Sequence, residues 1–343
     1  MRRVFGSVIA GVALCFTLIP LAAEASTAVV VKEQVSSTVS TSLPLLRISS
    51  TAKLTAAHLP TLNTNPRLKI SWQQIAPNRV QAVVTGKIVP GTNYLVDIPK
   101  SVQCATTCSF SGTKRVSLTS SVDYSWETQL LATLGYLPVS FTPDSPQGDP
   151  AAQTSGTFNW LYPVIASSLE PLWSPSTNNV ILKGALMNFQ SVAKLPTTGI
   201  VDTATWNALV AAVSANQVDP STYNYVNVSE TYPETLHLYL GGKLFFTTLI
   251  NTGIPQAPTA LGTYPVYLRL TSQTMSGTNP DGSHYSDPGI PWISYFNGGD
   301  ALHGYIRYHY GFPQSLGCVE MQFSDAKTVW PHTPIGTLVT IAP

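Results

Sequence analysis

Charged side chains are scarce in this sequence. Lys, Arg, Asp and Glu make up 10% of its 343 residues, against about 25% in an average soluble domain. The formal net charge is only +1, whereas a domain that binds nucleic acid usually carries a basic patch or stripe. Nothing in this composition therefore suggests a nucleic-acid partner, and glycan or peptide ligands are favoured. The length and the 44% hydrophobic fraction suffice for two or three compact domains.

The N-terminus has the composition of a targeting segment. Arg2 and Arg3 precede an apolar run over residues 4–21, and Ala23-Glu24-Ala25 follows it. This order is typical of a secretory signal peptide, which we place at residues 1–25. The alternative is an uncleaved segment that holds the protein on the membrane, because the run approaches spanning length. The sequence therefore predicts a secreted protein, with a membrane contact only through this segment.

Cysteine is also scarce. Of the four cysteines, Cys15 lies in the segment expected to be removed, which leaves three in an oxidising compartment. Cys104 and Cys108, in Cys-Ala-Thr-Thr-Cys, are predicted to form a disulfide; half a metal site is the alternative, but no histidine or acidic cluster lies nearby. Cys318 then remains as a reactive thiol. No metal is predicted, because metal-ligand spacing is missing from His237, His284 and His332.

The rest of the chain divides by pattern. Residues 26–65, rich in Ser, Thr and Ala, predict a flexible spacer. Residues 66–120 alternate apolar and polar side chains in short runs, which predicts a small β-rich domain. Residues 223–343 carry several strand patterns and no long helical stretch, so a mostly β domain is expected. Within it, Gly241-Gly242 predicts a two-residue hairpin turn.

Residues 125–213 differ, because their apolar residues follow helical spacing. Helices are predicted near 127–134, 179–190 and 202–209, the last with Asp202 or Thr203 as its N-cap. The segment resembles the helical peptidoglycan-binding domain of cell-wall enzymes. That resemblance rests on Phe189-Gln190, Leu195-Pro196, Thr198-Gly199, Asp202, Thr205-Trp206 and Ala208-Leu209. It implies a small helical fold; glycan binding and mere core packing both stay open.

Two short segments near the C-terminus carry residues suited to nucleophilic catalysis. They are Ala301-Leu302-His303-Gly304 and Ser315-Leu316-Gly317-Cys318. A thiol needs a base to become a good nucleophile, and an imidazole is a common one. Gly317 permits a close backbone approach to a ligand. His309, in the gap between the two segments, is a weaker alternative base.

This pair of segments resembles the L,D-transpeptidase catalytic domain, whose mark is His-Gly, a short gap and Ser/Thr-His-Gly-Cys. Here 15 positions separate His303 from Cys318. Further family-like stretches are 251–253, 259–264, 292–295 and 334–339. The resemblance implies Cys318 as nucleophile, His303 as base, and the Gly304 carbonyl as the group that orients the imidazole. It also implies an oxyanion hole of backbone amides around Leu316, Gly317 and Cys318, and it suggests substrate contacts for Tyr295 and Ser315.

Two positions depart from the family pattern. Leu316 stands where the family has a histidine, and Glu320 stands where an arginine is common. The first change removes a polar group beside the thiol, and the second reverses a charge. Both changes bear on the choice of donor substrate.

The resemblance implies acyl transfer through a cysteine thioester, from a tetrapeptide stem to an amine of another stem, giving 3–3 cross-links in the cell wall. Peptidoglycan stem peptides and glycan are the implied partners, carbapenems the implied inhibitors, and no cofactor is needed. The alternatives are hydrolysis, as in an L,D-carboxypeptidase, and a non-catalytic wall-binding protein.

Overall fold

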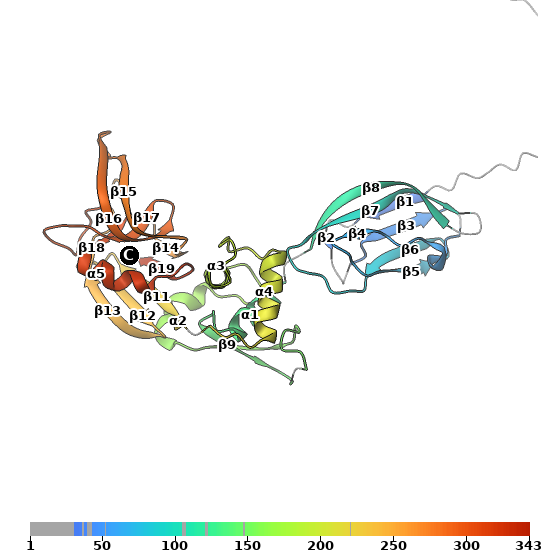
Figure 1. Cartoon of the computed structure of the whole chain (residues 1–343), viewed down its shortest axis with the longest axis horizontal. Helices are drawn as coiled ribbons and strands as arrows, with labels where there is room; N and C mark the ends of the chain where they lie inside the picture. The colour runs from blue at the N-terminus through green and yellow to red at the C-terminus, as the bar shows by residue number, and fades with distance from the viewer. Residues whose placement is uncertain are drawn as a thin grey trace, which may run out of the picture.

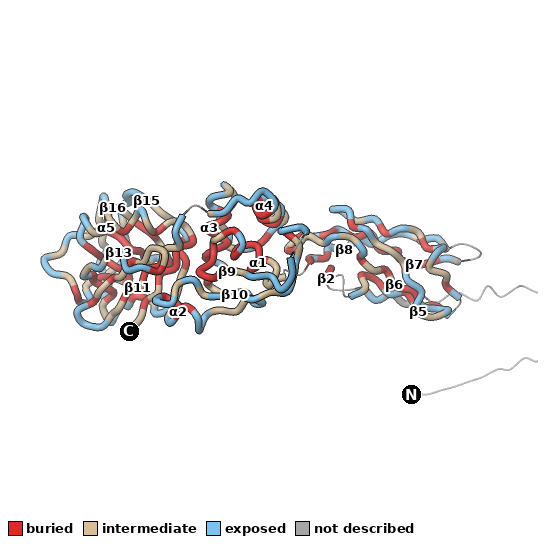
Figure 2. Tube along the Cα trace, turned by 90° about the horizontal axis from the view of Figure 1, so that it is seen from below, coloured by how far each residue is buried: buried red, intermediate tan, exposed pale blue. Residues whose placement is uncertain are grey.

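The computed structural model describes residues 31–35, 38–39, 43–51, 53–104, 108–120, 123–146, 148–219 and 221–343. The predicted signal peptide lies outside the described residues. So do the side chains of Cys104 and Cys108, and their disulfide stays a prediction. No helix within the described residues has the length and apolarity needed to cross a bilayer. Three bodies follow one another along the long axis, in the order of the sequence (Figure 1). Each has its own buried interior (Figure 2).

The N-terminal body consists of two four-stranded sheets. One has the order β1-β3-β6-β5, and the other β2-β8-β7-β4. Their strands are β1 (Val31–Val35), β2 (Thr38–Val39), β3 (Leu46–Ser50), β4 (Thr64–Asn65), β5 (Ile70–Ala76), β6 (Arg79–Val84), β7 (Asn93–Cys104) and β8 (Cys108–Ser120). One turn of 3-10 helix, η1 (Ala56–His58), precedes β4. Alternate side chains of β6 are buried, which accounts for the period-two pattern of the sequence.

The prediction of a flexible spacer over residues 26–65 is wrong for the second half of this range, as far as the structure describes it. Strand β3 lies between β1 and β6, pairing Leu46 with Ala82 and Ile48 with Val80. Leu46, Ile48 and Leu54 are buried in the core of this body. The apolar residues of β3 alternate over only five positions among Ser and Thr, which are compatible with strands as well as with spacers. The β-rich domain therefore begins before residue 66.

The middle body is mainly helical. Its elements are α1 (Tyr124–Thr133), β9 (Val139–Pro143), β10 (Gly156–Trp160), α2 (Pro163–Leu169), η2 (Glu170–Leu172), α3 (Val180–Val192) and α4 (Thr203–Ser214). The three expected helices correspond to α1, α3 and α4. Asp202 is the N-cap of α4, because its carboxylate accepts the amide of Thr205 at 2.8 Å. The hairpin β9–β10 was not predicted. Around these helices Trp206 and Leu209 are buried in a single core.

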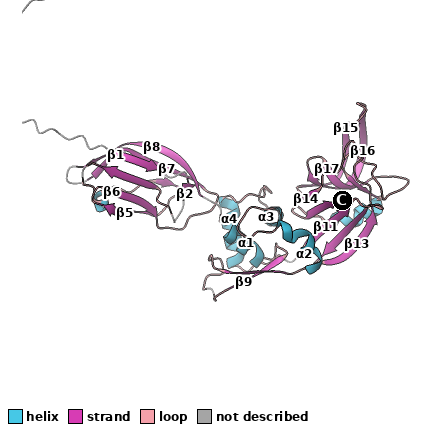
Figure 3. Ribbon diagram, turned by 180° about the vertical axis from the view of Figure 1, so that it is seen from behind, coloured by secondary structure: helices cyan, strands magenta, loops and turns pink. Residues whose placement is uncertain are grey.

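The C-terminal body is mostly β, as expected. One sheet has the order β13-β12-β11-β19-β14, and the other β15-β16-β17-β18. The first contains β11 (Asn224–Ser229), β12 (Thr235–Leu240), β13 (Lys243–Leu249), β14 (Gly262–Pro265) and β19 (Leu338–Ala342). The second contains β15 (Leu268–Thr278), β16 (His284–Asn297), β17 (Asp300–Gly304) and β18 (Val319–Met321), followed by α5 (Phe323–Val329) and η3 (Trp330–His332). Gly241 and Gly242 form the predicted turn between β12 and β13, both with positive φ. Strands β15 and β16 extend as a long hairpin beyond the rest of the body (Figures 1 and 3).

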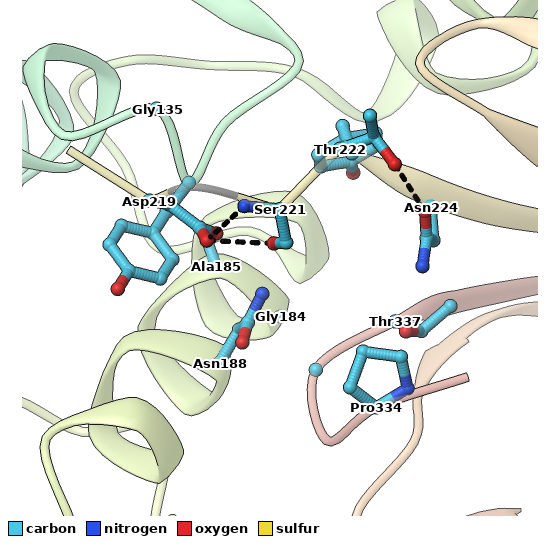
Figure 4. Close-up of a pocket in the computed structure, with 13 residues that line it drawn as sticks. Gly135, Gly184, Ala185, Asn188, Asp219, Ser221, Thr222, Asn224, Pro334 and Thr337 are labelled. Carbon is cyan, nitrogen blue, oxygen red and sulfur yellow. Dashed lines mark hydrogen bonds between the residues drawn. The ribbon is translucent and has the colours of Figure 1, made fainter. Parts of the chain in front are cut away.

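The middle and C-terminal bodies meet backbone to backbone. A side chain on Gly336 would lie 2.2 Å from the Gly184 carbonyl oxygen, and one on Gly184 would lie 2.7 Å from the Gly336 carbonyl oxygen. Leu338 of β19 is buried in the core of the middle body. Figure 4 shows helix α3, with Gly184 and Asn188, facing the segment that carries Pro334 and Thr337. Two glycines thus permit a tight joint between the helical body and the β sheet.

Candidate active site

Strand β17 positions His303. This strand lies between β16 and β18, and it pairs His303 with Glu320 of β18. The imidazole is buried, and its Nδ1 lies 3.0 Å from the carbonyl oxygen of Gly304. A carbonyl only accepts, so Nδ1 carries the proton and Nε2 keeps its lone pair. Burial is the main cause that lowers the pKa of His303, and the contact with Gly304 opposes it. The imidazole is therefore neutral and orients its basic nitrogen away from Gly304.

Cys318 ends the loop that leads into β18. Its thiol donates to the carbonyl oxygen of Gly299, with a sulfur–oxygen distance of 3.7 Å. Desolvation raises the pKa of Cys318 to about 12, and the nearby carboxylates of Asp300 and Glu320 add to the rise. The amide of Ala301 acts in the opposite direction. The resting thiol is thus protonated, unlike an activated thiolate.

His303 and Cys318 line the same cavity, of about 680 Å³. The hairpin β15–β16 forms one side of it through Gln273, Met275 and Tyr285. Ser315 and Leu316, from the loop before Cys318, also line it. The remaining lining residues are Ile254, Thr274, Ser276, Asn279, Pro280, Asp287, Ile290, Tyr295, Gly299, Asp300, Tyr305, Arg307, Gln314 and Glu320. The structure therefore brings the predicted nucleophile and base into one hollow large enough for a peptide segment.

The loop before Cys318 is held by hydrogen bonds of its own. The hydroxyl of Ser315 donates to the Cys318 carbonyl oxygen at 2.6 Å and accepts the Gly317 amide at 3.2 Å. Gly317 has φ of +111°, and a side chain there would lie 2.6 Å from Asp300 Oδ1. Ser315 thus orders the backbone around the thiol, and its predicted contact with substrate stays a prediction. Of the amides expected in the oxyanion hole, that of Gly317 is bound to Ser315.

A turn distant in sequence supports this loop. Asn251 and Glu320 exchange both backbone hydrogen bonds at 2.9 Å, and Ile254 donates to the Ser315 carbonyl at 2.9 Å. The buried carboxylate of Glu234 fixes the turn by accepting the amide and the hydroxyl of Thr252, each at 2.7 Å. The stretch 251–253, which contributed to the family resemblance, therefore holds the backbone on both sides of Cys318.

Two other predicted residues are found in different places. Tyr295 of β16 lines the cavity, where its hydroxyl donates to Gln273 Oε1 at 3.0 Å. His309, the alternative base, is exposed and lines a second hollow together with Ile306, Tyr308 and Phe323. Among the described residues, only one of the two candidate bases thus shares the cavity of Cys318.

Sequence reasoning missed a charged group beside the base. Arg307 binds Glu320 in two places, Nε to Oε2 at 2.8 Å and Nη2 to Oε1 at 2.9 Å. Its guanidinium also lies over the ring of Tyr305, 4.6 Å from the centroid. Asp287 of β16 accepts the Tyr305 hydroxyl at 3.2 Å. In the sequence, Glu320 is visible as a departure from the family pattern. Its partner could have been found from Arg307, an arginine that lies between His303 and Cys318.

Comparison with known proteins gives two family matches. Residues 223–341 match the L,D-transpeptidase catalytic domain (YkuD), and residues 178–209 match a putative peptidoglycan binding domain. Both resemblances predicted from the sequence are confirmed, and they support an enzyme of the L,D-transpeptidase family. Domains that act on peptidoglycan imply action outside the cytoplasm. No significant match was found among curated proteins.

Several solved structures are similar. The catalytic domain of the E. faecium L,D-transpeptidase is 25% identical and covers 36% of this chain and 99% of its own, with a TM-score of 0.32. An L,D-transpeptidase from Mycobacterium smegmatis is 9% identical and covers 92% of this chain and 98% of its own, with a TM-score of 0.33. LdtMt1 in complex with imipenem is 10% identical, with coverages of 92% and 98% and a TM-score of 0.33.

Proposed function

We propose that this protein is a peptidoglycan L,D-transpeptidase that forms 3–3 cross-links through a thioester on Cys318. The observation that carries the proposal is the shared cavity of Cys318 and His303, in which Gly304 fixes the imidazole. The family match over residues 223–341 supports the same reaction class.

The reaction begins from a neutral pair, because burial favours the protonated thiol and the unprotonated imidazole. The Cys318 sulfur attacks the carbonyl carbon of the bond between the diamino acid and the terminal D-Ala of a tetrapeptide stem. The thiol proton passes to Nε2 of His303 as the carbon–sulfur bond forms. Proton transfer during attack, rather than a stored ion pair, therefore activates the nucleophile.

The tetrahedral intermediate places negative charge on the former carbonyl oxygen, where backbone amides around Leu316 and Cys318 stabilise it. The intermediate collapses when Nε2–H protonates the departing D-Ala amine, which leaves the thioester. A side-chain amine of a second stem then attacks the thioester carbonyl and loses its proton to His303. The carbon–sulfur bond then breaks, the new amide is released, and His303 returns the proton to the Cys318 sulfur.

The helical body supplies the glycan-binding part of the proposal. Its peptidoglycan-binding match lies over residues 178–209, and helix α3 of this match contacts the catalytic body through Gly184. A peptidoglycan glycan chain bound to the helical body is thereby kept at a fixed distance from the catalytic cavity. Carbapenems, which acylate cysteine enzymes of this family, are the expected inhibitors of Cys318.

The test is mass spectrometry of products from the full chain incubated with purified disaccharide-tetrapeptide. Cross-linked dimers are expected from the wild type and not from Cys318→Ala. Tripeptide alone would identify a carboxypeptidase, since water would then be the acceptor. No conversion of any stem by a protein whose fold is intact would favour the non-catalytic wall-binding protein.

A further inference from the structure

The charges that line the catalytic cavity are unequal. Among its described lining residues, the acidic ones are Asp287, Asp300 and Glu320, while the cationic one is Arg307. His303 is kept neutral by burial. Three carboxyl groups against one guanidinium give the cavity an excess of acidic groups.

The guanidinium of Arg307 is already occupied. Nε and Nη2 bind the two oxygens of Glu320, and Nη2 also donates to the Gln314 carbonyl at 3.1 Å. One face of the group lies against Tyr305. Bidentate pairing of this kind is the strongest arrangement that an arginine makes with a carboxylate. A substrate carboxylate would have to compete with Glu320 for the same donors.

Asp287 lines the same cavity. Its carboxylate accepts the hydroxyl of Tyr305, and no ion pair to it is found among the described residues. Arg307 interacts with this carboxylate electrostatically, but its donors are bound to Glu320. A carboxylate without an ion-pair partner in a cavity attracts a further cation and repels an anion. Asp287 is therefore suited to receive an ammonium group from the substrate.

These charges surround the place where the reaction occurs. Glu320 is the strand neighbour of His303, and the charges of Glu320, Arg307 and Asp287 all act on that imidazole. In the donor stem, the scissile carbonyl belongs to the diamino acid, so the side chain of this residue starts beside His303. The end of that side chain must then lie among the three charged groups or turn away into solvent.

We propose that Glu320 and Asp287 make the enzyme select donor stems whose diamino acid ends in an ammonium group without a free carboxylate. Lysine and carboxamide-bearing diaminopimelate meet this requirement, and diaminopimelate with its free side-chain carboxylate does not. The proposal rests on the function proposed above, since it concerns the donor of the same acyl transfer.

The test compares three disaccharide-tetrapeptide donors that differ only at the third residue: lysine, carboxamide diaminopimelate and free diaminopimelate. The ratio of kcat/KM for the carboxamide form to that for the free form is expected to exceed ten in the wild type. Glu320→Gln releases Arg307 to bind the substrate carboxylate and should lower this ratio at least tenfold. Asp287→Asn should lower it as well, which keeps the test valid if Glu320→Gln fails to fold.

Asp281→Asn is the matched control, because Asp281 lies on the turn of the same hairpin and is not among the residues lining the cavity. Asp281→Asn should show the same kcat/KM ratio between the carboxamide and free diaminopimelate donors as the wild type. Equal use of all three donors, or a preference for the free carboxylate, overturns the proposal. Conversion of none of the three donors by a folded protein would instead refute the proposed function on which the selection depends, whether or not imipenem acylates Cys318.

Discussion

Nδ1 of His303 lies 3.0 Å from the carbonyl oxygen of Gly304, the residue that follows it on strand β17. The contact fixes the tautomer and the plane of the ring with a backbone group rather than with a carboxylate. A carboxylate partner would raise the pKa of the imidazole strongly by stabilising its positive charge, whereas a neutral carbonyl stabilises that charge less. This arrangement suits a base that accepts its proton only when the thiol attacks.

Replacing His303 should therefore remove the base without removing the nucleophile. His303→Gln is expected to slow acylation of Cys318 by imipenem roughly 100- to 10,000-fold, the usual contribution of a general base. Mass spectrometry of the adduct against time measures this rate. His309→Gln is the control, because His309 is exposed and lines another hollow. An equal loss in both variants would contradict the assignment of His303.

The pH dependence follows from the two pKa shifts. Burial lowers the pKa of His303 below its ordinary value of 6.5, so the imidazole stays neutral and acylation should persist below pH 6.5. Burial raises the pKa of Cys318 to about 12, so the thiolate appears only as the pH rises toward that value. Alkylation by iodoacetamide should thus keep increasing from pH 7 to 10. A plateau reached below pH 8 would indicate a preformed thiolate–imidazolium pair instead.

The sequence and the structure agree best where the chemistry is local. His303, Gly304 and Cys318 belong to short motifs, so the sequence was enough to predict them as parts of one site. The contact between Arg307 and Glu320 was not predictable, because it depends on how the loop between the two motifs folds back. Strand β3 was missed for a related reason, since only its pairing with β1 and β6 distinguishes it from a polar spacer.

Gly317 is expected to be essential for the position of the thiol. Alanine at φ of +111° is strained, and its Cβ would lie 2.6 Å from Asp300 Oδ1. Gly317→Ala should lower the imipenem acylation rate at least tenfold while circular dichroism shows a folded protein. Gly282→Ala separates backbone strain from the clash with Asp300. Gly282 also has a positive φ, of +87°, but an added Cβ there would meet no atom within 4 Å. Gly282→Ala should lower the free energy of unfolding by about 1 kcal/mol and leave the imipenem acylation rate unchanged.

At the joint between the helical and catalytic bodies, helix propensity and interdomain packing predict opposite changes in stability. In an isolated helix, Gly184→Ala would stabilise α3 by about 1 kcal/mol, because alanine is the better helix former. In this structure the added Cβ would lie 2.7 Å from the Gly336 carbonyl oxygen and 2.8 Å from Leu338 Cδ2. We therefore expect the opposite: a lower Tm, and faster proteolysis of the connection between α4 and β11.

Gly336→Ala should have the same effect from the other side of the joint, because its Cβ would lie 2.2 Å from the Gly184 carbonyl oxygen. Gly241→Ala is the matched control: it also has positive φ, but the nearest atom, Thr222 Cγ2, is 3.8 Å away. Small-angle scattering should report a longer particle for both joint variants and an unchanged one for Gly241→Ala. A raised Tm for Gly184→Ala with unchanged scattering would mean that the two bodies do not depend on this contact for their arrangement.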